Sequence, residues 1–174
     1  FFDCASAIQI DTWSVKKGFH VELRNCKVEL PSASAVSGGI NGATQAIEVE
    51  AHEAGALSLK LDKVDIVASD RVHGCSLITV EATKQNDPSG VQPAVLVEIE
   101  PCRIGTATGS SGVYIEGAGL EVLSRIKGAG DLVIRNSDFV NCRGDGIIVG
   151  AQGGEKSGED FFLSTWTVDA RYST

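Results

Sequence analysis

The sequence is poor in basic residues, and this deficit argues against two kinds of partner. Its 174 residues include 15 Lys and Arg against 23 Asp and Glu, so the formal net charge is −8. Nucleic acids and anionic membrane surfaces are bound through clustered positive charge, so we expect neither as a partner. Long apolar runs are also missing. None approaches the ~20 residues of a membrane-spanning helix, so membrane insertion is not expected.

Features of a signal peptide and of common catalytic or metal-binding motifs are scarce as well. Methionine is absent, and residues 1–4 have neither the basic start nor the apolar centre of a signal peptide, so we expect a segment of a longer protein. The five cysteines include no Cys-x-x-Cys pair, which argues against a zinc knuckle or a thioredoxin-type site. No serine nucleophile elbow and no phosphate-binding glycine loop is recognisable.

The residues that are present suit one globular domain over residues 1–174. The chain is 43% apolar and 22% charged. Many short segments rich in Val, Ile and Leu alternate apolar and polar residues, and no capped helical run appears. The 20 glycines gather in clusters that mark turns. These features predict an all-β fold.

A strand-like pattern repeats along the chain with a period of about 35 residues. A first apolar-x-apolar pattern begins at Ile8, Ile47, Ile78, Val113 and Ile147. A second begins at Val21, Leu57, Val97, Leu132 and Phe161. A shorter third segment contains Val28, Val64, Ile104, Phe139 and Val168. Three short strands per repeat predict a solenoid of about four to five coils, whose units must stack to bury their apolar faces.

Residues 132–149, LVIRNSDFVNCRGDGIIV, carry a family resemblance. A strand of the form L-x-I-x-N turns into a second strand, and a G-x-G-I-x-V strand follows. Residues 21–28 repeat the first half of this motif. The chain is thus similar to the right-handed parallel β-helix superfamily, the pectin-lyase-like fold. The resemblance implies an all-β, right-handed parallel β-helix with three short strands per coil.

This superfamily includes pectin and alginate lyases, polygalacturonases, phage tailspikes and adhesins, so the resemblance does not select an activity. It implies an extracellular or cell-surface location. The paired aspartates of the polygalacturonases, and the calcium-binding Asp with a catalytic Arg of the pectate lyases, are not matched. The resemblance therefore favours a non-catalytic module over an enzyme.

The repeat also predicts where the cysteines lie. Cys26 and Cys102 occupy matching positions two coils apart, about 10 Å at the usual strand spacing. A disulfide requires Cα atoms within about 7 Å. Cys4, Cys75 and Cys142 fall near one corner, again on alternate coils. We therefore expect free thiols.

Residues between the apolar positions of a strand face outward and form columns along the stack. The second strands would contribute a column of mixed sign, namely Arg24, Lys60, Glu100 and Arg135. The first strands would contribute a column of acids, namely Asp11, Glu50, Glu81 and Glu116. The same strands add Glu48 and Tyr114 to the candidate ligand-binding residues.

Carboxylates about 5 Å apart repel each other by ~1 kcal/mol in water. The side chains can fan apart as a solvated acidic surface. A cation such as calcium can bind, with Glu50 and Glu81 as the metal ligands. A proton held at a raised pKa would suit an acid–base pair drawn from Glu50, Glu81 and Glu116. No other cofactor is expected.

Three long segments should project beside the acidic column and make a groove, namely Thr83 to Pro93, Gly117 to Gly130 and Gly150 to Asp160. We therefore expect a module of a larger secreted or surface protein that presents an acidic face to a polysaccharide or protein ligand. The alternatives are a carboxylate-based polysaccharide lyase or glycoside hydrolase, and a structural spacer or adhesin stalk. Neither end of the chain resembles a polar cap, so neighbouring domains or oligomer partners are expected to cover the ends of the stack.

Overall fold

The computed structural model describes residues 6–12, 18–30, 45–51, 57–69, 76–82, 95–106, 115, 117–124, 129–143, 145–151 and 165–171. These residues form twelve β-strands and contain no helix, which confirms the all-β prediction. All pairings between the strands are parallel.

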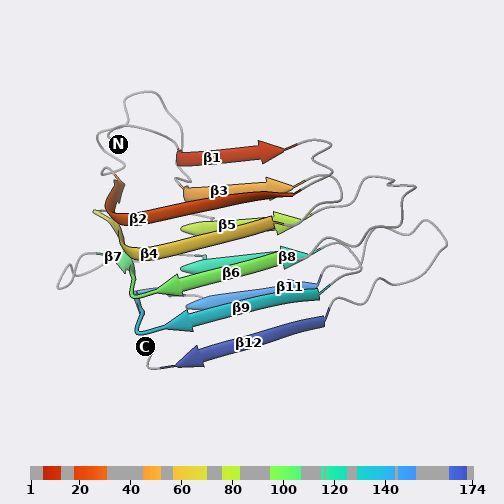
Figure 1. The fold of residues 1–174 in the computed structure, drawn as a ribbon. Helices are drawn as coiled ribbons and strands as arrows, with labels where there is room; N and C mark the ends of the chain where they lie inside the picture. Colours follow the sequence, from red (N-terminus) through yellow and green to blue (C-terminus); the bar gives the residue numbers. More distant parts are fainter. Residues whose placement is uncertain are drawn as a thin grey trace.

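Five strands form one parallel sheet, in which sequence order is also spatial order (Figure 1). They are β1 (Ser6–Thr12), β3 (Gln45–Ala51), β5 (Ile78–Ala82), β8 (Leu120–Ser124) and β11 (Ile147–Ala151). Ile8 pairs with Ile47, and Ile47 pairs with Ile78, so residues one repeat apart lie side by side.

Seven strands form the second sheet, which faces the first across the core (Figure 1). They are β2 (Phe19–Leu30), β4 (Leu57–Ala68), β6 (Val95–Glu100), β7 (Arg103–Thr106), β9 (Ala129–Arg135), β10 (Asp138–Val140) and β12 (Thr165–Arg171). The chain alternates between the two sheets, and each pass adds its strand beside the strand of the previous pass.

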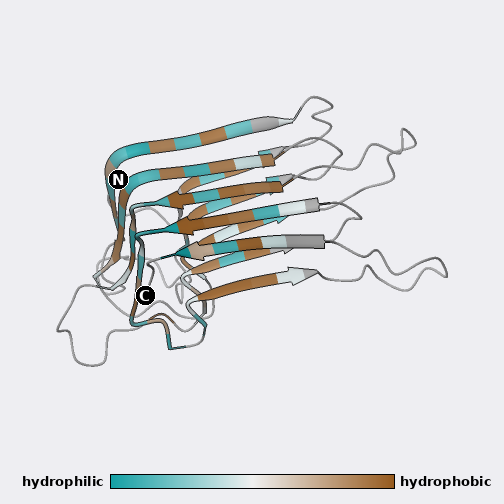
Figure 2. Cartoon of the chain, turned by 60° about the horizontal axis from the view of Figure 1, so that its bottom comes forward, coloured by the Kyte–Doolittle hydropathy of each residue, from teal (hydrophilic) through white to brown (hydrophobic). Residues whose placement is uncertain are grey.

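The long strands of the second sheet turn through a sharp corner, which Figure 2 shows as a bend near one end of each strand. Asn25 in β2, Lys63 in β4 and Asn136 between β9 and β10 have left-handed backbone conformations, with φ of 50°, 55° and 50°. Asn accepts this conformation more readily than most residues, which explains the Asn of the L-x-I-x-N motif. Pro101 lies at the equivalent point between β6 and β7 and interrupts the strand.

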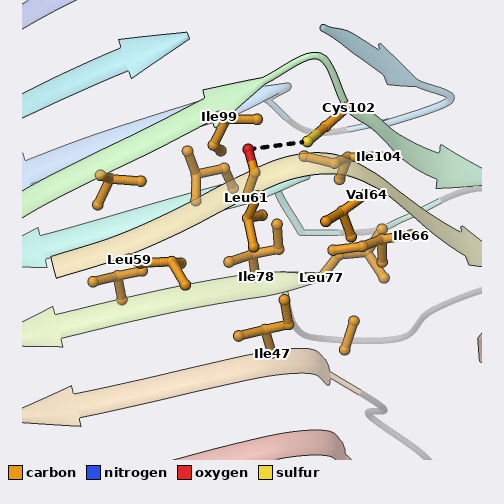
Figure 3. Close-up of a cluster of buried hydrophobic side chains, with 14 of the residues drawn as sticks. Ile47, Leu59, Leu61, Val64, Ile66, Leu77, Ile78, Ile99, Cys102 and Ile104 are labelled. Carbon is orange, nitrogen blue, oxygen red and sulfur yellow. Dashed lines mark hydrogen bonds between the residues drawn. The ribbon is translucent and has the colours of Figure 1, made fainter. Parts of the chain in front are cut away.

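The core lies between the two sheets and consists of one residue in two from each strand. Figure 2 shows this alternation as apolar and polar bands along the strands. Leu59, Ile78 and Ile99 are each 0% exposed, and Figure 3 shows side chains from both sheets meeting in this layer. At the corner, the Cys102 thiol donates a hydrogen bond to the Leu61 carbonyl, with sulfur and oxygen 3.5 Å apart (Figure 3).

The described cysteines are free thiols, as the repeat predicts. Cys26, Cys102 and Cys142 form no disulfide. Cys26 pairs with Val64 of β4, and Cys102 lies on the far side of β4, so one strand separates them. The backbone of Cys142 forms an isolated parallel β-bridge with Ile115, so its partner there is not a cysteine. Cys4 and Cys75 lie outside the described residues.

Two strand assignments made from the sequence were wrong. The register partner of Ile78 is Leu120 of β8, where the repeat placed Val113, and β8 lies within the segment 117–130, which is therefore not one long loop. Ile115 instead bridges Cys142, ahead of the next strand. The register partner of Leu132 is Val168 of β12, where the repeat placed Phe161; residues 161–163 lie outside the described residues. In both places two apolar-x-apolar patterns compete, and pairing with the neighbouring strand selects between them.

Candidate functional site

The outward side of the five-stranded sheet carries most of the residues selected from the sequence. In β3, Ile47 and Val49 point into the core and are 0% exposed, while Glu48 and Glu50 point outward and are partly exposed. The period-two alternation of a β-strand produces this arrangement. Strands β1 and β5 repeat it and place Asp11 and Glu81 on the same side.

Asp11, Glu50 and Glu81 lie in one column, on three successive strands. Asp11 pairs with Glu50, and Glu50 pairs with Glu81. The column does not continue to Glu116 as expected, because the register partner of Glu81 in β8 is Leu123. Glu116 and Tyr114 lie outside the described residues. The predicted four-acid column is therefore three acids long.

A second outward column lies beside the first and contains two more carboxylates. Its members are Gln9, Glu48, Thr79, Glu121 and Ile148. Glu121 is not among the residues predicted from the sequence, although Leu120-Glu121-Val122 has the same apolar–acid–apolar pattern as Ile47-Glu48-Val49. We name the outward carboxylates Asp11, Glu48, Glu50, Glu81 and Glu121 the acidic face.

Glu121 is held by a buried hydroxyl. Ser76 is 3% exposed and donates a hydrogen bond to Glu121, with Oγ and Oε2 2.7 Å apart. The Ser76 Oγ also accepts a hydrogen bond from the Ala118 amide at 3.1 Å. Nearby, the Gln45 side-chain amide donates to the Thr79 hydroxyl at 2.9 Å. These bonds restrict the side chains around one carboxylate of the acidic face.

Burial and the neighbouring carboxylates both act on the Glu48 side chain. Its pKa is raised, first because partial burial disfavours the carboxylate and then because Glu50, Asp11 and Glu81 repel it. Glu48 thus binds a proton more readily than an ordinary glutamate. The three repelling groups are the members of the predicted column.

The geometry offers no ready-made metal centre. Within the part of the chain that the structure describes, no three His, Cys, Asp or Glu side chains are grouped so that they could hold a metal ion. A calcium site at Glu50 and Glu81 therefore stays a prediction from the sequence. No membrane-spanning helix is found among the described residues either.

The outward side of the other sheet carries charges of both signs, but its register differs from the expectation. The column predicted to contain Arg24, Lys60, Glu100 and Arg135 contains Asp62 in place of Lys60, because Arg24 pairs with Asp62. Lys60 lies in the next column, beside Glu22 and Glu98.

Several of the outward charges of the larger sheet form ion pairs. The Arg24 guanidinium lies 2.6 Å from the Glu22 carboxylate, and that of Arg135 lies 3.3 Å from Asp169. Lys60 Nζ is 3.9 Å from Glu98 Oε2. Mixed charge on this side is therefore present, with different partners from those predicted.

Cys102 and Cys142 are unsuited to nucleophilic chemistry. Burial raises the pKa of the Cys102 thiol and of the Cys142 thiol. A raised pKa keeps the thiol protonated near neutral pH, and the thiolate is the reactive form. Cys102 and Cys142 are therefore structural residues.

The groove expected beside the acidic column involves segments that the structure mostly does not describe. Residues 83–94 and 152–164 lie outside the described residues. Gly117 to Gly130 contains strand β8, and Gly150 belongs to β11. The described part of the site is thus the acidic face itself.

Comparison with known proteins adds no relative. No protein-family model matches the chain, and no curated protein or solved structure shows a significant match.

Proposed function

We propose that this chain is a non-catalytic parallel β-helix module of a larger secreted or cell-surface protein, and that its acidic face binds a positively charged ligand. One observation carries the proposal. The strands of the five-stranded sheet contain five acids and no Lys or Arg. The strands of the other sheet contain nine acids and seven bases.

Three features support the β-helix. The strands pair in parallel, their order follows the sequence, and the chain visits the two sheets in turn. Residues with a left-handed backbone conformation recur at the corner of the second sheet, namely Asn25, Lys63 and Asn136. Crossover connections between parallel strands of one sheet are right-handed in about 98% of cases, which supports a right-handed coil.

The charge distribution supports a cationic ligand. Clustered charge of one sign raises the local concentration of oppositely charged ligands and orients their approach. Anionic polysaccharides would be repelled by the acidic face. A basic protein segment or a glycan bearing amino groups would be attracted, and both belong to the ligand classes expected from the sequence.

Binding of defined probes tests this proposal. We would titrate the chain with glucosamine oligomers and with a lysine-rich peptide, using N-acetylglucosamine oligomers as the uncharged control. Removing an exposed charge pair changes a free energy by about 0.2–1 kcal/mol. Glu50→Gln/Glu81→Gln should therefore weaken binding by about 2- to 25-fold, and added salt should weaken the binding of the unmodified chain.

Glu98→Gln/Glu100→Gln is the matched control, since it removes two carboxylates from the larger sheet while the acidic face is kept. It should leave the affinity within about twofold. Binding that is absent for every cationic probe, or equally weakened by Glu98→Gln/Glu100→Gln, would contradict the proposal. Absence of binding would favour the structural spacer.

The raised pKa of Glu48 favours one second candidate, the carboxylate-based lyase or hydrolase. A carboxyl group whose pKa is raised keeps its proton to a higher pH, which favours a general acid, with Glu50 or Glu81 as the charged partner. Depolymerisation of a panel of acidic and neutral polysaccharides tests this candidate. Activity that is lost in Glu48→Gln, with the circular dichroism spectrum unchanged, would establish it; an inert unmodified chain would remove it.

A further inference from the structure

The C-terminal end of the two sheets exposes apolar positions that are buried in the preceding strands. Among the described strands, β12 pairs with β9 alone and β11 with β8 alone. Val168 of β12 is 53% exposed, whereas its register partner Leu132 is 0% exposed. Ile147 and Val149 of β11 are only partly buried, while their partners in β8 are 0% exposed. The apolar layer between the sheets is therefore incompletely covered at β11 and β12.

The N-terminal end has the same property. Within the described part of the chain, β1 pairs only with β3, and β2 pairs only with β4. Ile8 and Ile10 of β1 and Val21 and Leu23 of β2 are partly buried, although they occupy inward positions. Their register partners in β3 and β4 are at most 1% exposed. Both ends thus leave apolar surface accessible to water.

The outer strands β2 and β12 lack two of the features that block addition of another strand, namely proline and charged side chains that point inward. The charged side chains that they do carry point outward. The sequences of β2 and β12 contain no proline. In β12, Asp169 and Arg171 flank the inward position of Ala170 and form an ion pair with each other at 2.7 Å. Both edges can therefore accept a further parallel strand.

We propose that the β11–β12 edge of one chain docks against the β1–β2 edge of a second copy, so that both sheets continue across the junction. A second copy fits because the inward residues of the two edges belong to the same columns. Val168 and Val21 belong to a single column, which also contains the buried Leu132, Val97 and Leu59. Docking would continue that column.

The remaining inward positions match in the same way. The column of Ile147 leads through β8, β5 and β3 to Ile8, and that of Val149 leads to Ile10. The junction would therefore bring apolar residues together at each of these positions. It would resemble the packing of successive strands within the chain.

The outward charges of the two edges are of opposite sign along the diagonals, although Asp169 would lie directly opposite Glu22 and Arg171 opposite Arg24, as Arg135 lies opposite Arg171 within the chain. Each edge strand of the larger sheet presents one acid and one base, paired as Glu22 with Arg24 and as Asp169 with Arg171. Within the chain, Arg135 of β9 reaches diagonally to Asp169 of β12, with nitrogen and oxygen 3.3 Å apart. The same diagonal at the junction would join Arg171 of one copy to Glu22 of the next. In the smaller sheet, Ile148 and Gly150 would face Gln9 and Asp11, which brings no like charges together.

This junction joins two different edges, so it does not close on itself. Heterologous contacts of this kind generate open, linear assemblies rather than dimers. The five strands of the smaller sheet mark five stacked layers, which at ~4.8 Å each give an axial repeat of roughly 24 Å per copy. The docked chains would form filaments with this repeat.

Sedimentation velocity over a concentration series tests the docking. The unmodified chain should show a weight-average sedimentation coefficient that rises with concentration. Val168→Asp places a charge at an inward position of one edge and should abolish the rise. Thr167→Asp places the same charge at the adjacent outward position and should retain it. Circular dichroism and urea unfolding would verify that both variants fold.

Mixing experiments identify which edges meet. Val168→Asp keeps its β1–β2 edge, so it should end growing assemblies and lower the sedimentation coefficient of the unmodified chain at substoichiometric amounts. Val21→Asp should be monomeric alone and should form only a 1:1 complex with Val168→Asp. If Val21→Asp does not fold, the mixture of Val168→Asp with the unmodified chain still tests the docking. A chain that stays monomeric at all concentrations, or a Val168→Asp variant that assembles alone, would overturn the proposal.

Discussion

The corner of the second sheet yields the sharpest prediction about stability. Three equivalent positions, Asn25, Lys63 and Asn136, adopt left-handed conformations with φ between 50° and 55°. The left-handed region costs most L-residues about 1–2 kcal/mol, and Asn less. Lys63 is therefore the strained member of the series. Lys63→Asn should raise the free energy of unfolding by about 0.5–1 kcal/mol, since it relieves part of that cost.

Two further substitutions separate backbone strain from charge. Lys63→Gln removes the same exposed charge without a residue suited to the left-handed region, so it should change stability by less than about 0.5 kcal/mol. Asn136→Val introduces a β-branched residue at the matching corner and should destabilise by about 1–2 kcal/mol.

Urea unfolding followed by circular dichroism measures these differences. With a slope of about 2 kcal/mol per molar urea, Lys63→Asn should move the midpoint upward by roughly 0.25–0.5 M. The slopes of the variants must agree with that of the unmodified chain for the comparison to hold. Equal gains from Lys63→Asn and Lys63→Gln would show that charge, and not the corner, is responsible. An unchanged Asn136→Val variant would refute the argument directly.

Three other predictions concern close packing and ionisable groups. Gly105 has φ of 150°, and a Cβ there would lie 2.1 Å from the Val140 carbonyl oxygen. Gly105→Ala should therefore lower the free energy of unfolding, measured in urea, by about 2–4 kcal/mol. A loss below about 0.5 kcal/mol would contradict this. The raised pKa of Glu48 means that its protonation stabilises the folded chain below the unfolded pKa near 4.5 and that this stabilisation is lost as pH rises through the folded pKa. Glu48→Gln should therefore add about 0.2–1 kcal/mol at pH 7 and nothing near pH 3.5, and a loss of stability at pH 7 would count against the repulsion. Burial and the raised pKa of the Cys102 and Cys142 thiols predict at least tenfold slower alkylation at pH 8 in the folded chain than in urea, as measured by mass spectrometry of the labelled peptides; equal rates would refute their burial.

Much of the architecture follows from local sequence pattern. Alternation within segments such as Ile47-Glu48-Val49-Glu50 is enough to predict strands with one buried side, and the structure has β3 there. The repeat of about 35 residues places Ile8, Ile47 and Ile78 in one register, and they pair as expected. The Asn of the L-x-I-x-N motif indicates the corner at Asn25 and Asn136, because few other residues tolerate the left-handed backbone.

The candidate site could be predicted only in part. Asp11, Glu50 and Glu81 follow correctly from the repeat, since each lies one position beyond a well-marked apolar pair. Glu121 was missed because two apolar-x-apolar patterns lie within ten residues of each other, at Val113 and at Leu120. The sequence also contains no sign of the Ser76 hydroxyl that holds Glu121, because the two residues are 45 positions apart.

The sequence by itself determined that the chain is all-β, which side of β1, β3 and β5 is buried and where the corners at Asn25 and Asn136 fall, because each of these depends on the preferences of a few adjacent residues. Only the tertiary structure decided the register of β8 and β12, and hence which charges share a column. A shift in register leaves the apolar alternation of a strand intact, so the local pattern cannot distinguish between the alternatives. Pairing between strands does distinguish them. The pairing of β8 with β5 buries Leu120 and Val122 in the core, and the pairing of β12 with β9 places Val168 beside Leu132. The predicted fourth acid, Glu116, was replaced in its column by Leu123 for this reason.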